Sequence, residues 1–120
     1  MKKYIPLHVH SMYSLLDGLS KPEQIADRCE EIGVKSCALT DHGNIAGAIK
    51  FYSAMKKRGI KPILGCELYI CDDDATVKDK ENRKLSHFLV LAKNYDGWKN
   101  LVRIVSESNR PEYYYFKPRL

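Results

Sequence analysis

Residues 34–44 read VKSCALTDHGN, a short and mostly apolar run that ends in a polar turn. An apolar run of this length, preceded by Gly33 and followed by the turn, predicts a buried strand over residues 34–40. Asp41 and His42 come directly after that strand, and both residue types bind metal ions in proteins. The stretch therefore predicts a buried strand whose carboxyl end presents potential metal ligands.

The same alternation of apolar runs and helical patterns continues on both sides of this stretch. Three further strands are expected, over residues 4–9, 62–70 and 87–92. Three helices are expected, starting at the capping box formed by Ser20 and Glu23, at Asn44, and at Asn94 or Asp96. The resulting order β-α-β-α-β-β-α, with nearly continuous apolar strands, predicts an α/β fold in which helices cover a parallel sheet.

The size and composition of the chain are those of one small domain. Its 120 residues are 44% apolar and 29% charged, as in ordinary globular proteins. A full (β/α)8 barrel would need roughly 250 residues. No apolar run could span a bilayer and no signal-peptide pattern is present, so we expect a cytoplasmic protein with no membrane partner. The net charge of +5 suits a partner made of phosphates, although solvated helix faces account for it without any partner.

Two further features concern the interior and the loops. The four cysteines have no C-x-x-C spacing, and at least three fall on predicted core positions; they are Cys29, Cys37, Cys66 and Cys71. We interpret them as reduced core residues in preference to zinc ligands or disulfide partners. Residues 71–85 are charged and contain few apolar side chains, which predicts a long exposed loop.

Histidines and acidic residues recur where the predicted strands end. His8 and His10 follow the first strand and, two residues apart in an extended chain, must point to the same side. Such a pair alone is more often two surface histidines than a metal site. Ligands gather at the carboxyl ends of parallel strands, however, so the occurrence of this pair together with four other residues favours metal binding. The four are Asp17, Asp41, His42 and Glu67.

A cluster of imidazoles and carboxylates can hold two or three divalent ions, with a carboxylate such as Glu67 as a bridge. Closely spaced ions lower the pKa of a bound water and neutralise the charge that develops during phosphoester hydrolysis. The sequence has no serine or cysteine nucleophile motif, no glycine-rich phosphate loop and no dinucleotide fingerprint. We therefore expect water activated by metal to be the nucleophile.

Five segments of the sequence, taken together, resemble a known family. They are HVHS at 8–11, LDG at 16–18, TDHGN at 40–44, GCE at 65–67, and residues 87–94. They resemble the opening of the polymerase and histidinol phosphatase (PHP) domain, and more narrowly the PHP domain at the N-terminus of bacterial replicative DNA polymerase III alpha subunits. The resemblance spans essentially the whole chain. It implies a distorted seven-stranded β/α barrel, of which residues 1–120 would form about the first half and the remainder would be absent.

The resemblance also implies a set of metal ligands for zinc, manganese or iron, with up to three ions in a complete site. His8, His10 and Glu67 would hold one ion, Glu67 and His87 a second, and Asp17 and His42 a third. Asp41 would serve catalysis by orienting a ligand and would not bind an ion itself. His87 opens its predicted strand, where no ligand is expected, so a histidine without a ligand role remains the alternative there.

Three functions are compatible with these residues. The first is a segment of a metal-dependent phosphoesterase or 3′–5′ exonuclease that acts in DNA replication. The second is a non-catalytic, metal-stabilised structural or interaction module of the polymerase, and the third is a stand-alone phosphatase of the histidinol-phosphate kind. The expected partners are DNA, bound through the parent polymerase, the rest of the polymerase or a complementing chain, and a proofreading subunit. Because later ligands and strands are missing, we expect the isolated chain to be inactive or weakly active.

Overall fold

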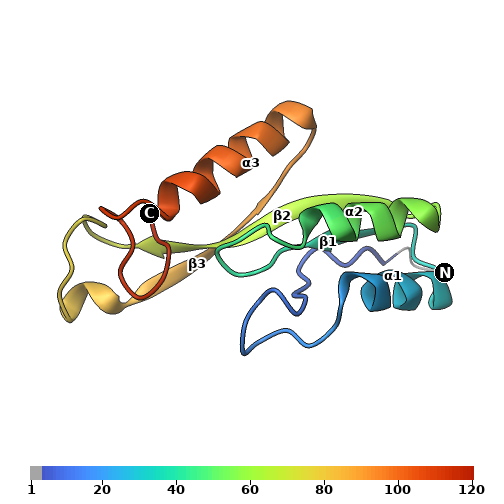
Figure 1. Cartoon of the computed structure of the whole chain (residues 1–120), viewed down its shortest axis with the longest axis horizontal. Helices are drawn as coiled ribbons and strands as arrows, with labels where there is room; N and C mark the ends of the chain where they lie inside the picture. The colour runs from blue at the N-terminus through green and yellow to red at the C-terminus, as the bar shows by residue number, and fades with distance from the viewer. Residues whose placement is uncertain (1–3) are drawn as a thin grey trace.

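The computed structural model describes residues 4–120, which fold into a sheet with helices packed against it (Figure 1). No helix among these residues is long and apolar enough to cross a membrane. In chain order the elements are α1 (Pro22–Glu31), β1 (Ser36–Leu39), α2 (Ala48–Lys57), β2 (Lys61–Cys71), the 3-10 helix η1 (Glu81–Arg83), β3 (Leu85–Leu91) and α3 (Tyr95–Ser108).

The sheet has the order β1-β2-β3, with β1 parallel to β2 and β3 antiparallel to it. The prediction of a parallel sheet is therefore confirmed for the first pair and wrong for the second. A parallel connection needs a crossover, usually a helix, that covers the sheet. The segment between β2 and β3 forms only η1, and β3 returns directly along β2.

Residues 4–9, predicted as the first strand, are extended and lie beside β1 without forming a regular ladder. Two bonds tie them to that strand, from Ala38 N to Pro6 O and from Thr40 N to Val9 O, both 2.8 Å long. The Thr40 hydroxyl adds a bond from Val9 N at 2.9 Å. These contacts place the two histidines around Val9 near the carboxyl end of β1.

The starts of the helices agree with the sequence only in part. For α1 the predicted capping box of Ser20 and Glu23 is wrong by one residue, because Gln24 Oε1 accepts from Lys21 N at 2.8 Å. The carbonyl of Ser20 instead accepts a bond from Met12 N, which closes the loop before the helix.

Of the other two predicted helix starts, the one at Asn44 is wrong and the one at Asn94 is confirmed. Asn44 does not cap α2, which begins at Ala48. Its amide donates to the carbonyls of Tyr13 and His42, both at 3.0 Å, and so holds the turn after β1. Asn94 does cap α3, as predicted, by accepting from Gly97 N at 2.9 Å.

Two apolar clusters form the core. The larger joins α1, α2 and β1, and includes Ile25, Cys29, Cys37, Phe51 and Met55. The smaller joins α3 to β2 through Cys66, Leu68, Leu101 and Val105. All four cysteines are buried, as the core prediction requires, and burial raises the pKa of the Cys37 and Cys66 thiols to about 12.

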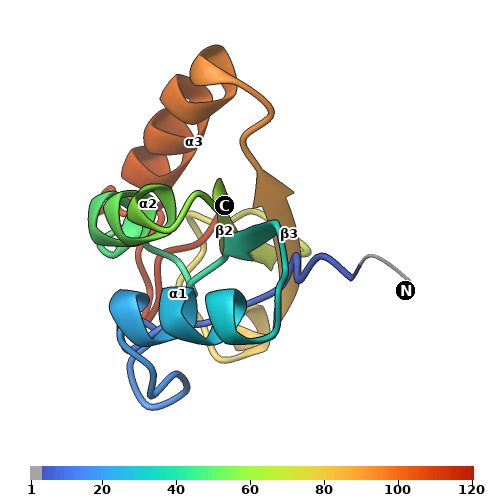
Figure 2. The same ribbon diagram turned by 90° about the vertical axis from the view of Figure 1, so that its right-hand side faces the viewer.

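Strand β2 has two faces with different tasks, because successive side chains of a strand point to opposite sides. Cys66 and Leu68 pack with residues of α3. Figure 2 shows α3 beside the sheet. Glu67 and Tyr69 face the other way. One strand therefore supplies both a core face and a polar face.

The charged segment between β2 and β3 is mostly exposed, but two of its residues are buried. Asn82 donates to the carbonyls of Asp74 and Val77, at 2.7 and 3.0 Å. Ala75 is only 8% exposed. The segment is thus a folded loop with its own anchor.

Candidate metal centre

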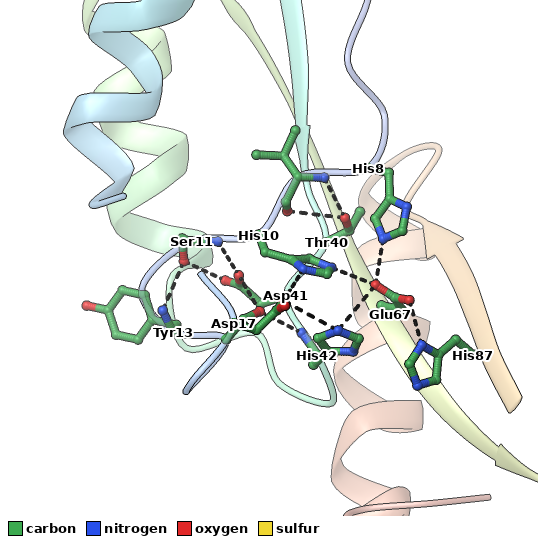
Figure 3. Close-up of polar contacts among 12 residues, drawn as sticks. His8, His10, Ser11, Tyr13, Asp17, Thr40, Asp41, His42, Glu67 and His87 are labelled. Carbon is green, nitrogen blue, oxygen red and sulfur yellow. Dashed lines mark hydrogen bonds and ion pairs between the residues drawn. The ribbon is translucent and has the colours of Figure 1, made fainter. Parts of the chain in front are cut away.

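Glu67 lies at the centre of a group of four imidazoles on the polar face of β2 (Figure 3). The Nε2 atoms of His8 and His10 each lie 2.6 Å from Glu67 Oε2. His87 Nδ1 lies 3.0 Å from Oε1, the other oxygen, and His42 Nε2 lies 3.7 Å from Oε2. All four predicted histidines thus converge on one carboxylate, which is itself only 5% exposed.

Asp17 joins the same group from the loop after residue 10. Its Oδ2 contacts His10 Nδ1 and lies 3.5 Å from His42 Nε2. The potential ligand atoms form three overlapping sets, each with all atoms within 4.8 Å of one another. The sets are His8, His10 and Glu67; His10, Asp17 and His42; and His42, Glu67 and His87.

The direction of β3 explains how His87 reaches this group. In the antiparallel ladder His87 is paired with Tyr69, so its side chain lies on the same face as Tyr69 and Glu67. The beginning of an antiparallel strand lies beside the end of its partner. His87, near the start of β3, is therefore at the same end of the sheet as residues that follow β1.

Asp41 is buried, and its contacts reach the loop that carries Asp17. Its oxygens accept from Ser11 N at 2.6 Å, from the Ser11 hydroxyl at 2.8 Å and from the Ser14 hydroxyl at 3.0 Å. The Ser14 oxygen in turn accepts from His42 N at 3.0 Å. Asp41 thus orders the loop and its junction with His42, while a role in catalysis stays a prediction.

The electrostatic environment sets the protonation of two central groups. Burial lowers the pKa of His42, an effect reinforced by the neighbouring imidazoles of His10 and His87 and opposed by Glu67 and Asp17. Burial opposes ionisation of Glu67, but the hydrogen bonds from His8 and His10 and the electrostatic attraction of His42 and His8 together outweigh it, and the pKa of this carboxyl lies below its usual value. A neutral imidazole and an ionised carboxylate are the forms that bind metals.

The donor set fits a divalent metal ion. Imidazole nitrogens and carboxylate oxygens suit zinc, manganese and iron, whereas thiolates, which would select softer metals, are absent from the three sets. His10 places both ring nitrogens against carboxylates, although a neutral imidazole carries only one N–H. His42 Nδ1 is buried without a hydrogen-bond partner among the described residues. Metal ions among these groups would bind ring nitrogens and carboxylate oxygens that hydrogen bonds within the group do not fully satisfy.

Two neighbours of this group were not predicted. The Tyr69 ring stacks on His42, with centroids 5.4 Å apart and an interplanar angle of 12°. The ammonium of Lys117 lies 4.5 Å from the centre of the Tyr69 ring. The two-residue spacing from Glu67 could have revealed Tyr69. Lys117 lies in a stretch, residues 117–119, that follows the pattern of the resembled family, but no local signal places it beside Tyr69.

Comparisons with known proteins agree with this geometry. The sequence profile of the PHP domain matches residues 6–120. The chain is 47% identical over 119 residues to the DNA polymerase III subunit alpha of Helicobacter pylori strain 26695, and 46% identical over 120 residues to that of Borreliella burgdorferi. These matches cover 99% and 98% of this chain but 10% of each relative. The chain thus spans about a tenth of the length of the curated relatives it matches.

Two solved structures share the fold. An amidohydrolase from Chromobacterium violaceum, with bound sulfate and no metal, has a TM-score of 0.60 at 26% identity and is matched over 86% of this chain and 34% of its own. A protein of Bifidobacterium adolescentis described as a metal-dependent phosphoesterase has a TM-score of 0.62 at 20% identity, over 90% and 35%. The expected partial β/α barrel is confirmed. Because the family profile extends over residues 6–120, this chain belongs to the PHP domain family.

Proposed function

We propose that this chain binds divalent metal ions and contributes them to phosphoester hydrolysis within a replicative DNA polymerase, including 3′–5′ removal of nucleotides. The observation that carries the proposal is the convergence of four imidazoles on the two oxygens of Glu67. The proposed ligands are the six residues of the three sets: His8, His10, Asp17, His42, Glu67 and His87. Zinc, manganese and iron are the candidate ions.

Each part of the group has its own task in this proposal. Bound ions would lower the pKa of water and neutralise phosphate charge. Glu67 presents Oε2 to His8 and His10 and Oε1 to His87, so one carboxylate can serve two adjacent positions. The side chains of His8, His87 and Asp17 are 55%, 48% and 47% exposed. A phosphoester would approach the group where these side chains face solvent.

The relatives suggest the setting of the reaction. The matched proteins are alpha subunits of DNA polymerase III, and this chain corresponds to a tenth of their length. We therefore propose DNA as the source of the phosphoester and the rest of a polymerase, with a proofreading subunit, as partners. Polymerisation itself would belong to other parts of such a protein.

Replacing Glu67 by glutamine tests the proposal in the full-length protein. The change keeps the shape of the side chain but removes the charge that two sets share. We expect metal affinity to fall at least about 100-fold, because even residues that only orient ligands are worth 10- to 100-fold. Metal content by elemental analysis and release of nucleotides from 3′-labelled single-stranded DNA are the measurements.

A matched control is Glu31→Gln, which removes an exposed carboxylate paired with Arg28 on α1. It should leave metal content and hydrolysis unchanged. Hydrolysis that continues at the full rate after Glu67→Gln has emptied the site would contradict the proposal. Polymerisation by the same preparation shows that the protein is folded.

One observation favours a second function, in which the metal stabilises the domain without catalysis. The group joins residues 8 and 10 to a carboxylate 59 and 57 positions further along the chain. Bound ions would therefore fasten the N-terminal segment to β2 and β3. In that case Glu67→Gln would lower the melting temperature or the binding of a partner, and metal-loaded protein would show no hydrolysis with any divalent ion.

A further inference from the structure

A cavity of about 450 Å³ lies directly beside the metal centre. It is lined by Asp17, His42 and His87, which are proposed metal ligands. It is also lined by Phe116 and Lys117, from the segment after α3. A molecule in this cavity would touch the metal ligands and this segment at the same time.

Lys117 is the only cationic side chain that lines this cavity among the described residues. Within residues 4–120 no carboxylate lies within 4.0 Å of its ammonium, which instead lies over the Tyr69 ring. The ring faces the lysine on one side and stacks with His42. The Lys117 ammonium thus contacts the same tyrosine ring that stacks with His42, a proposed metal ligand. Because no carboxylate of the described residues pairs with it, the ammonium can bind an anionic oxygen.

Phe116 presents a large apolar ring to solvent, with 66% of the residue exposed. Its φ of 59° is left-handed, a conformation that is costly for any residue except glycine. Arg83 lies 4.2 Å from the centre of this ring. A second cavity of about 340 Å³ beside Arg83 shares Tyr69, His87, Phe116 and Lys117 with the first, so Phe116 and Lys117 line both cavities.

A buried arginine holds this segment in place. Arg119 is fully buried and donates to the carbonyls of Asn82, Ala75 and Val77, at 2.6, 2.9 and 2.7 Å. The last residue continues the anchoring, because Leu120 N donates to Tyr69 O and its carbonyl accepts from Cys71 N. The position of Phe116 and Lys117 is therefore fixed by the sheet and by the loop before β3.

From this arrangement we infer that Phe116 and Lys117 form a binding subsite for a nucleotide end. Lys117 binds a phosphate oxygen of the nucleotide, and the base stacks on the exposed ring of Phe116. An aromatic ring beside a cation is how proteins hold single-stranded nucleic acid without reading its sequence. The inference rests on the proposed function, because it assigns the substrate class of the same centre.

Binding of two probes to the full-length, metal-loaded protein tests the subsite. Thymidine 5′-monophosphate carries a base, and 2-deoxyribose 5-phosphate does not. Lys117→Met should weaken both probes about 10-fold in isothermal titration calorimetry. Phe116→Ala should weaken only the nucleotide about 10-fold, and Phe116→Tyr, which keeps the ring, should bind it as the unchanged protein does.

The control is Lys56→Met, because Lys56 also lies over a tyrosine, 5.8 Å from the Tyr52 ring centre, but does not line the cavity. It should change neither affinity. Metal content must stay constant in all variants, which separates the subsite from the metal ligands. Equal affinities of unchanged and Lys117→Met protein, or a Phe116→Ala variant that still prefers the nucleotide, would overturn the inference. If the variants behave as expected but DNA is not hydrolysed, the subsite stands and the proposed phosphoesterase function fails.

Discussion

His42 and Glu67 make the stability of the metal-free protein depend on pH. Burial lowers the pKa of His42 from its usual 6.5, so below that value the unfolded chain binds the proton more readily than the folded one. Despite its burial, the pKa of Glu67 lies below its usual 4.5, so its contribution is present above that value and is lost as the pH falls. Both effects act in the same direction, and acid should destabilise the fold.

We therefore expect the melting temperature of the metal-free protein to fall as the pH is lowered from 7 to 4. Thermal unfolding in the presence of chelator, followed over this range, is the measurement. His42→Asn removes the titrating imidazole and should flatten the part of the curve nearest pH 6.5. A melting temperature that rises toward acid would show that the two groups do not have the shifted pKa values described.

Single residues differ in how well the sequence predicts their role. The six proposed ligands were predictable, because His42 follows an apolar run, Glu67 lies within one and the others occur in motifs of the family. Tyr69 was missed because an aromatic residue in a strand is ordinarily part of the core. Lys117 was missed because its place depends on Arg119, whose contacts reach 37 to 44 positions back along the chain.

Among the elements, the loop between residue 10 and α1 decides where Asp17 lies. Gly18 lies so close to this loop that an added Cβ would be 2.0 Å from Ser11 O, a backbone atom. Leu16 already adopts a left-handed φ of 63° in the same turn. A side chain at position 18 would therefore displace Ser11, whose backbone N–H donates to Asp41.

Gly18→Ala should therefore displace the loop and weaken the site of His10, Asp17 and His42. We expect loss of about one metal ion per protein, or a 10- to 100-fold lower affinity as for other changes that misplace ligands. Titration of metal into metal-free protein measures this. The control is Gly97→Ala in α3, where the added Cβ meets nothing closer than 3.4 Å and helix propensity favours alanine. Full metal binding by Gly18→Ala would mean that the loop tolerates the displacement.

Element types were predicted better than their directions and ends. Apolar runs identified β1 and β2, and Asn94 identified the start of α3, because these signals are local. The direction of β3 was predicted wrongly. A parallel β3 would need a crossover, usually a helix, after β2, but the segment between β2 and β3 forms only η1. Ser20 and Asn44 have good capping side chains, yet Ser20 accepts a bond from Met12 N with its backbone carbonyl and the Asn44 amide holds the turn after β1.

For the whole molecule, the metal centre is the point where segments far apart in the chain meet. It joins the extended segment through His8 and His10, the following loop through Asp17, and β2 and β3 through Glu67 and His87. The larger apolar cluster joins mainly α1, α2 and β1, and the extended segment packs against it through Val9. Ions that bind only the folded protein stabilise it, by about 2.7 kcal/mol at a concentration 100 times the dissociation constant.

Removing the metal should therefore loosen the protein unevenly. With chelator we expect faster hydrogen exchange at the amides of Ala38 and Thr40, which bind the extended segment, and in β3. Amides inside α1 and α2 should exchange at an unchanged rate, because the core around Phe51 and Met55 holds them without metal. Hydrogen exchange with mass spectrometry of the full-length protein, with and without metal, resolves these segments. Exchange that stays the same everywhere after the metal has left would mean that hydrogen bonds alone hold the segments together, and that the ions serve chemistry only.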